Sequence, residues 1–227
     1  SDVMMPEMNG YELCTAIKSD INLCHIPIIF LTAKNDIDSK VKGLKVGAEA
    51  YIEKPFSYDY LKAQILSLLN NRQKEREAFS KRPFFPVQNM QMSKEDEVFM
   101  NKVIEVINAN MEDETFNVER MAEALCLSRS SLLRKIKTLF NMSPIDFIRL
   151  IRLKKAAELI QDGKYRVGEI SYMVGFGSHS YFSKLFFKQF GMTPKDFELQ
   201  IASTRSKVRN VQEINIEDLI QNNRANS

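Results

Sequence analysis

The chain contains an internal repeat, in which residues 128–147 align with residues 178–197 at an offset of 50 positions and without a gap. The identical pairs are Ser128 with Ser178, Ser130 with Ser180, Phe140 with Phe190, Met142 with Met192, Pro144 with Pro194, Asp146 with Asp196 and Phe147 with Phe197. A gapless match of this extent indicates two copies of one supersecondary unit. Any fold of this chain must therefore give both segments the same local structure.

In each copy a short helical pattern is followed by a tight turn and a second helical pattern. The short helices are expected over 118–125 and 167–174, and the second helices over 128–139 and 178–190. Ser128 and Ser178 stand at the expected N-caps, where a hydroxyl accepts a hydrogen bond from a free backbone N–H. The pattern indicates a helix-turn-helix, present twice.

A continuous helical pattern over residues 146–161 separates the two copies, and Gly163 is placed to end it. At 1.5 Å per residue this rod would be about 24 Å long. Two helices that read one face of a DNA duplex lie about 34 Å apart, so the rod and the width of the motifs give a spacing of the right order.

The first 80 residues follow a different pattern. Short apolar runs over 26–33 and 50–55 predict buried strands of a parallel sheet, and each is followed by a helical pattern, the first ending at Gly47. This order predicts an α/β fold at residues 1–80. Residues 81–93 hold two prolines and no acidic group, and are interpreted as a linker before an all-α domain at 94–199 and a flexible tail at 200–227.

Charge is unevenly distributed along the chain, although its net value is only +3. Residues 94–127 carry 3 basic and 9 acidic side chains, whereas residues 128–199 carry 13 basic and 6 acidic ones. A surface that binds a polyanion would give this asymmetry, and so would a solvated lysine-rich helix.

Composition and cysteine content narrow the class of protein. A hydrophobic fraction of 44% and a charged fraction of 27% are typical of a soluble globular chain. Three cysteines without metal-ligand spacing fit a reducing compartment. No apolar run is long enough to span a membrane, so we expect a cytoplasmic segment without membrane contact, whose parent polypeptide could be anchored upstream.

Residues 94–199 resemble the C-terminal DNA-binding domain of AraC-type transcription activators, above all in EISYMVGFGSHSYFSKLFFKQFGMTP at 169–194. The resemblance implies a seven-helix domain whose two helix-turn-helix units place their second helices in successive major-groove segments of double-stranded DNA. The residues expected at the DNA are Ser128, Arg129, Ser131, Arg134, Lys135 and Lys137 in the first copy, and His179, Ser180, Ser183, Lys184 and Lys188 in the second. Of these, Lys135, Lys137 and Lys188 are expected to serve phosphates.

The apolar residues between these positions recur at helical spacing and are expected in the core. They are Leu125, Leu132, Leu133, Ile136, Phe140, Phe176, Phe182, Phe186 and Phe190.

DVMMPEMNGYEL at residues 2–13 resembles the centre of a response-regulator receiver domain, a doubly wound, flavodoxin-like fold. The resemblance implies that Asp2 is the phosphoacceptor, that Thr32 and Tyr51 are the switch residues, and that Lys54 binds phosphate. It also implies a Mg²⁺ ion, for which this chain offers Asp2 and the Met4 carbonyl. Because further strands and an acidic pair of a complete receiver are missing before Asp2, we expect a truncated receiver that binds Mg²⁺ and accepts phosphate poorly.

The two resemblances together predict a transcription regulator of a phosphorelay, controlled by aspartyl phosphorylation. The expected partners are a histidine kinase or phosphotransfer domain, RNA polymerase and a second copy of the chain, and activation is the expected mode. The alternative is the C-terminal output part of a hybrid sensor histidine kinase. We expect no enzyme, and a protein-interaction module with basic helices remains the rival class.

Overall fold

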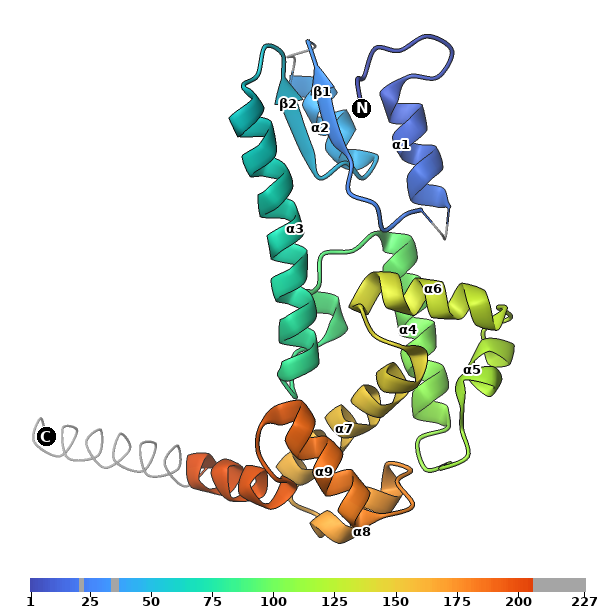
Figure 1. Cartoon of the computed structure of the whole chain (residues 1–227), viewed down its shortest axis with the longest axis vertical. Helices are drawn as coiled ribbons and strands as arrows, with labels where there is room; N and C mark the ends of the chain where they lie inside the picture. The colour runs from blue at the N-terminus through green and yellow to red at the C-terminus, as the bar shows by residue number, and fades with distance from the viewer. Residues whose placement is uncertain (21–22, 34–36, 206–227) are drawn as a thin grey trace, which may run out of the picture. The chain divides into compact units, whose positions relative to one another are not determined.

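The computed structural model of the chain describes residues 1–20, 23–33 and 37–205 (Figure 1). These residues form two compact units. Unit 1 comprises Ser1–Asn110 and Thr115–Ile151, and unit 2 comprises Met111–Glu114 and the chain from Arg152 onward.

Unit 1 begins with a small α/β layer. Its elements are α1 (Gly10–Ser19), β1 (Ile29–Thr32), α2 (Ile37–Lys45), β2 (Ala50–Glu53) and α3 (Tyr58–Lys81). The two strands pair in parallel, with Ile29 opposite Ala50 and Thr32 opposite Glu53. The backbone of Ser1 bonds to the other edge of β1, through Ile29 O and the Leu31 N–H. The parallel βα order predicted for the N-terminal residues is confirmed.

Local chemistry explains the ends of these elements. The side chain of Asn9 accepts hydrogen bonds from Tyr11 N and Glu12 N and so caps α1, and Ser57 caps α3 in the same way. Gly47 follows α2 with φ of +97°, a conformation that glycine adopts without strain. Behind the sheet, Val3, Tyr11, Cys14, Ile28, Phe30 and Ala48 form a buried cluster. This cluster packs α1 against the two strands.

The rest of unit 1 is helical. It contains a short 3-10 helix η1 (Val87–Asn89), α4 (Lys94–Ala109), α5 (Val118–Ala124), α6 (Arg129–Phe140) and the first part of α7 (Pro144–Asp162). Segment 81–93, predicted as a linker, includes η1 and buries Val87 and Met90. The predicted N-cap at Ser128 is present, since its side chain accepts from Ser131 N, and Pro144 is the first residue of α7.

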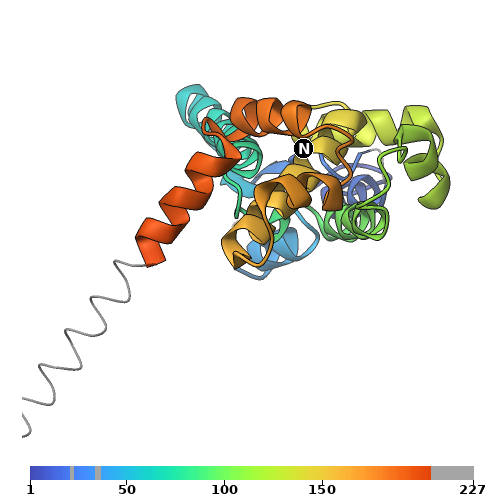
Figure 2. The same cartoon turned by 90° about the horizontal axis from the view of Figure 1, so that it is seen from below.

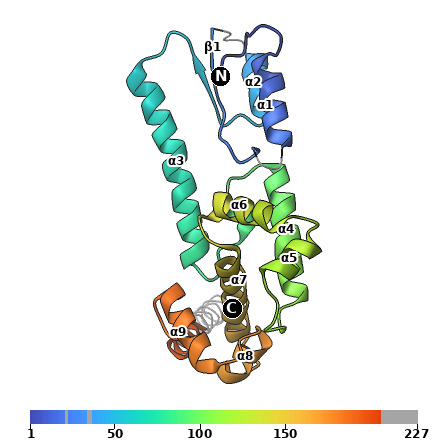
Figure 3. The same cartoon turned by 45° about the vertical axis from the view of Figure 1, so that its right-hand side comes forward.

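An aromatic cluster joins three of these helices within unit 1. The ring centroid of Phe79 in α3 lies 4.9 Å from that of Phe140 in α6 and 6.1 Å from that of Phe147 in α7. Phe140 and Phe147 are themselves 4.8 Å apart. Contacts of this kind add to the free energy of burial. The C-terminal half of α3 is thereby fixed beside the end of α6 (Figure 3).

Unit 2 contains the second helix-turn-helix, α8 (Val167–Met173) and α9 (His179–Phe190), followed by a helix over 194–205 that is drawn in red (Figure 2). Phe176, Phe182, Phe186 and Phe197 lie in its core. The guanidinium of Arg152 donates to Gly175 O at 2.9 Å and to Asp113 O at 2.5 Å, which ties segment 111–114 to the turn after α8. In the described part of the chain, no helix combines the length and apolarity needed to cross a membrane.

Two expectations about these regions need correction. Leu133 was expected in the core but is 45% exposed, because α6 turns Leu132 and Ile136 inward and position 133 outward. Residues 200–205, expected in a flexible tail, continue a helix. The remainder of the tail prediction, 206–227, lies outside the described residues. The single rod between the two copies is confirmed by the 19 residues of α7, about 28 Å in length.

The turn after α8 gives a direct test of packing in unit 2. Gly175 has φ of +73°, and a Cβ built there would lie 2.5 Å from Met111 O and 2.7 Å from Arg152 Cζ. We expect Gly175→Ala to lower the free energy of unfolding by more than about 1 kcal/mol, measured by chemical denaturation. Gly168→Ala is the matched control, because its Cβ would meet nothing within 4 Å. Equal stability of the two variants would contradict this description of the turn.

Candidate phosphoacceptor site and nucleic-acid interface

The carboxyl edge of the parallel strands brings together three of the residues predicted for the receiver site. Thr32 ends β1 and is fully buried, and Lys54 follows β2 and donates its backbone N–H to Thr32 O at 2.9 Å. Asp2 follows Ser1, whose backbone pairs with the outer edge of β1. Lys54 Nζ lies 2.6 Å from Asp2 Oδ2. Ligands of open α/β folds bind at this edge of the sheet.

The Asp2 carboxylate is held in its charged form. The hydrogen bond from Lys54 lowers the pKa of Asp2 below its usual value, and a further bond from the Met4 N–H, at 3.2 Å, acts in the same direction. An ionised carboxylate is the state required of a nucleophile. The Lys54 ammonium at the same place can neutralise charge on an incoming phosphoryl group.

The residues at this edge do not make a complete magnesium site. Mg²⁺ requires near-octahedral oxygen coordination, with one or two carboxylates and further oxygen ligands. Asp2 already pairs with Lys54, and the described residues form no group of three or more His, Cys, Asp or Glu side chains suited to a metal ion. The donor set present therefore does not fit the ion by itself.

Tyr51, the predicted switch aromatic, lies half-buried on β2. Its ring meets the ring of Phe30 with a centroid distance of 6.2 Å, and it packs against the buried cluster behind the sheet. The side chain is thus placed on the same two strands as Thr32 and Lys54, with its ring against the core.

The first helix-turn-helix presents most of its predicted DNA residues to solvent. Ser128, Arg129, Arg134 and Lys137 are exposed, and Ser131 is half-buried beside the Ser128 cap. Arg129 forms an exposed ion pair with Glu119 of α5 at 2.9 Å. A solvent-exposed pair of this kind contributes little free energy, so Arg129 can exchange this partner for another anion.

Lys135 differs from the other predicted contacts, because its side chain is only 5% exposed. It forms an ion pair with Asp96 of α4 and lies 3.0 Å from Cys24 Sγ. The expectation that Lys135 serves a DNA phosphate does not describe this structure. Its repeat counterpart, Leu185, also packs against a core, which shows that this position faces inward in both copies.

The second helix-turn-helix has the same arrangement with different side chains. Ser178 caps α9 by accepting from Tyr181 N. His179, Ser180, Lys184 and Lys188 are exposed, and Ser183 is half-buried. Two aromatic residues that the sequence pattern does not predict at this surface are also exposed, Tyr181 at 45% and Phe187 at 54%. In the repeat they align with the polar residues Ser131 and Lys137, and this alignment is the sequence signal that could have identified the two positions.

Comparison with protein families and curated proteins matches separate parts of the chain. Residues 1–66 match the model of the response regulator receiver domain, and residues 121–200 match that of a helix-turn-helix domain. Histidine kinase P4 of Formosa agariphila is 40% identical over 198 residues, which cover 87% of this chain and 14% of that protein. Probable transcriptional regulator ycf29 of Pyropia yezoensis is 44% identical over 71 residues, covering 31% of this chain and 30% of that protein. The chain therefore spans less than a third of the length of either relative.

Among solved structures, the chain is similar to the C-terminal domain of AraT, a response regulator from Geobacillus stearothermophilus. The identity is 29%, the match covers 45% of this chain and 84% of that one, and the TM-score is 0.41.

The Asp2–Lys54 pair predicts a change in titration. Because the pKa of Asp2 is lowered in the folded chain, the pair stabilises the fold above the ordinary pKa of 3.8, and this contribution is lost as pH falls through the folded value. We expect Lys54→Met to raise the pKa of Asp2, measured by carbon NMR of the carboxyl group. Lys40→Met is the control, because Lys40 forms an exposed ion pair with Glu53 instead of Asp2. An unchanged pKa of Asp2 in Lys54→Met would show that Lys54 does not lower it.

Proposed function

We propose that this chain, which joins a response regulator receiver segment to an AraC-type helix-turn-helix domain, is a sequence-specific DNA-binding regulator of a phosphorelay. The observation that carries the proposal is the repeated helix-turn-helix, in which a serine caps each second helix and polar or basic side chains near its start are exposed. Such helices fit the major groove of double-stranded DNA.

Within each unit we propose two roles for the polar and basic residues of the second helix, contact with bases and contact with phosphates. Arg134 of α6 and Lys184 of α9 occupy equivalent positions in the repeat and are proposed to contact bases. Six further residues lie near Arg134 and Lys184 at the starts of the two helices: Ser128, Arg129 and Ser131 in the first copy, and His179, Ser180 and Ser183 in the second. Lys137 and Lys188, with the helix N-termini, would hold phosphates and set the register.

The receiver segment is proposed to control this output. Asp2 would accept a phosphoryl group from a histidine kinase or phosphotransfer domain, while Lys54 and the Thr32 hydroxyl bind its oxygens. Tyr51 would respond to the change at Thr32. Support comes from the ionised Asp2 beside Lys54 at the carboxyl edge of the sheet. We assign the chain no enzymatic step beyond accepting this group.

A second proposal concerns the parent polypeptide. We propose as the alternative that this chain is the C-terminal output part of a hybrid sensor kinase. Its support is the relative named as a histidine kinase, which matches 87% of this chain and 14% of its own length. Catalytic kinase domains would then lie upstream. Action as a dimer, activation through RNA polymerase and a cytoplasmic location accompany the proposal.

DNA reading is tested by selecting random duplexes on the chain at about 150 mM salt, which suppresses purely electrostatic retention. We expect the selected duplexes to share two short base sequences about one helical turn apart, one read by α6 (the α6 box) and one read by α9 (the α9 box). Arg134→Ala and Lys184→Ala should each weaken specific binding by about 1–3 kcal/mol and relax preference in one box only. Lys62→Ala, an exposed lysine on α3, is the control. Recovery of unpatterned DNA would favour the rival reading, a protein-interaction module.

Phosphoryl acceptance is tested with a small-molecule phosphodonor and Mg²⁺. Because the described ligand set is incomplete, we expect slow labelling of this chain, and none after Asp2→Asn. Mass spectrometry of the intact protein gives the stoichiometry. Labelling that survives Asp2→Asn would show that another residue is the acceptor, and rapid labelling of the unmodified chain would show that the site is complete.

A further inference from the structure

We propose that Arg76 is a positioning residue for the first reading helix, so that α3 controls DNA contacts of α6 and leaves those of α9 unaffected. The inference rests on the proposed function, because it concerns how one of the two reading helices is held. α3 begins within the receiver match and extends past its end at residue 66 to Lys81. It is therefore a covalent continuation of the receiver segment toward the helical part of unit 1.

The Arg76 guanidinium caps the C-terminus of α6. Its Nε donates to Leu139 O at 2.9 Å and its Nη2 donates to Thr138 O at 2.8 Å. Carbonyl groups in the last turn of a helix have no partner within the helix, and the helix dipole adds negative potential there. A half-buried cation that donates two hydrogen bonds to these carbonyls fixes both the position and the direction of the helix end.

Other residues on the same face of α3 reinforce this contact. Phe79, three residues beyond Arg76, packs against Phe140 at the end of α6. Arg72, four residues before it, donates to His25 O and to Glu49 Oε1, the latter at 2.8 Å. Residues at this spacing share one helical stripe. A displacement of α3 would therefore be transmitted along this stripe.

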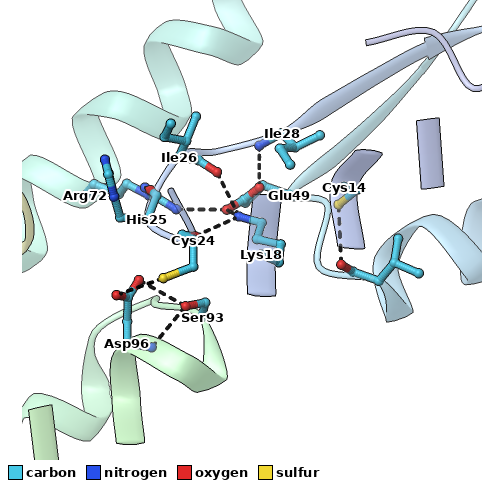
Figure 4. Close-up of polar contacts among 11 residues, drawn as sticks. Cys14, Lys18, Cys24, His25, Ile26, Ile28, Glu49, Arg72, Ser93 and Asp96 are labelled. Carbon is cyan, nitrogen blue, oxygen red and sulfur yellow. Dashed lines mark hydrogen bonds and ion pairs between the residues drawn. The ribbon is translucent and has the colours of Figure 1, made fainter. Parts of the chain in front are cut away.

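A second contact between the receiver segment and α6 lies at Lys135. Asp96 is fully buried and pairs with Lys135, and Cys24 Sγ lies 3.4 Å from Asp96 Oδ1 and 3.0 Å from Lys135 Nζ. Figure 4 shows Cys24 pointing toward Asp96 while Lys18 and Arg72 converge on Glu49. These groups hold the segment around Cys24 in place. The receiver segment thus contacts α6 both at its middle and, through α3, at its end.

The second copy of the repeat is built differently at the same positions. Leu185 replaces Lys135 and packs against the apolar core of unit 2. The backbone caps, by contrast, are alike: Asn141 after α6 and Gly191 after α9 are both left-handed, and each donates its N–H to the carbonyl four residues before it. The charged inward position is therefore a feature of α6 that the repeat itself does not require.

We test the proposal in the whole chain with the variants Arg76→Met and Arg76→Lys. The control is Lys74→Met, because Lys74 is an exposed residue on the same helix. Binding is compared between a duplex with both boxes and duplexes in which one box is scrambled. The penalty for a box is the factor by which scrambling it weakens binding. In Arg76→Met we expect the α6 box penalty to fall about three- to tenfold, because a contact at the end of the helix is lost. The α9 box penalty should stay unchanged, Arg76→Lys should recover part of the loss, and Lys74→Met should match the unmodified chain.

Amide hydrogen exchange gives a readout that does not depend on DNA. Arg76→Met should accelerate exchange at residues 137–140 and leave residues 187–190 unchanged. If the unmodified chain discriminates no boxes, the proposed function fails, while the exchange result still decides the positioning role. Equal loss at both boxes, no loss at either, or equal acceleration in both helices would overturn the inference.

Discussion

A buried ammonium and carboxylate must stay together, because removing one partner leaves an uncompensated charge at a cost of about 3–5 kcal/mol. In unit 1 this constraint falls on Lys135 of α6 and Asp96 of α4. Asp96 also accepts from Ser93, and Cys24 covers the pair from the receiver side. The first helix-turn-helix and the receiver segment lie in one compact unit, and the cover by Cys24 is a contact between them.

The two copies of the repeat therefore have equivalent surfaces and different supports. Their outward faces share the serine cap and the basic residue at positions 134 and 184. Inward, α6 depends on ionic and hydrogen-bonded contacts to α3, α4 and Cys24, whereas α9 rests on phenylalanines of its own unit. Polar contacts depend on distance and direction more strongly than apolar packing does, so α6 is the helix better suited to respond to the receiver.

Much of the fold could be predicted from local patterns. The parallel strands, the serine caps, Pro144 at the start of α7 and the single rod of α7 all follow from periodicity and capping chemistry. Local patterns failed where a side chain's surroundings come from distant residues. Lys135 looked like a phosphate contact, and Leu133 looked like a core residue, because helical spacing alone does not fix which face is covered. Nothing in the local sequence marked Arg76 as the partner of α6, since 62 positions separate it from Thr138.

The sequence by itself determined the repeat, the order of strands and helices, and the residue types at the candidate phosphoacceptor and DNA-reading positions. These properties depend on backbone hydrogen bonding and side-chain periodicity within a few turns of chain. Only the tertiary structure decided that Lys54 meets Asp2, that Lys135 is enclosed by Asp96 and Cys24, and that Arg76 caps α6. Such contacts join residues far apart in sequence, and their geometry is set by how whole elements pack.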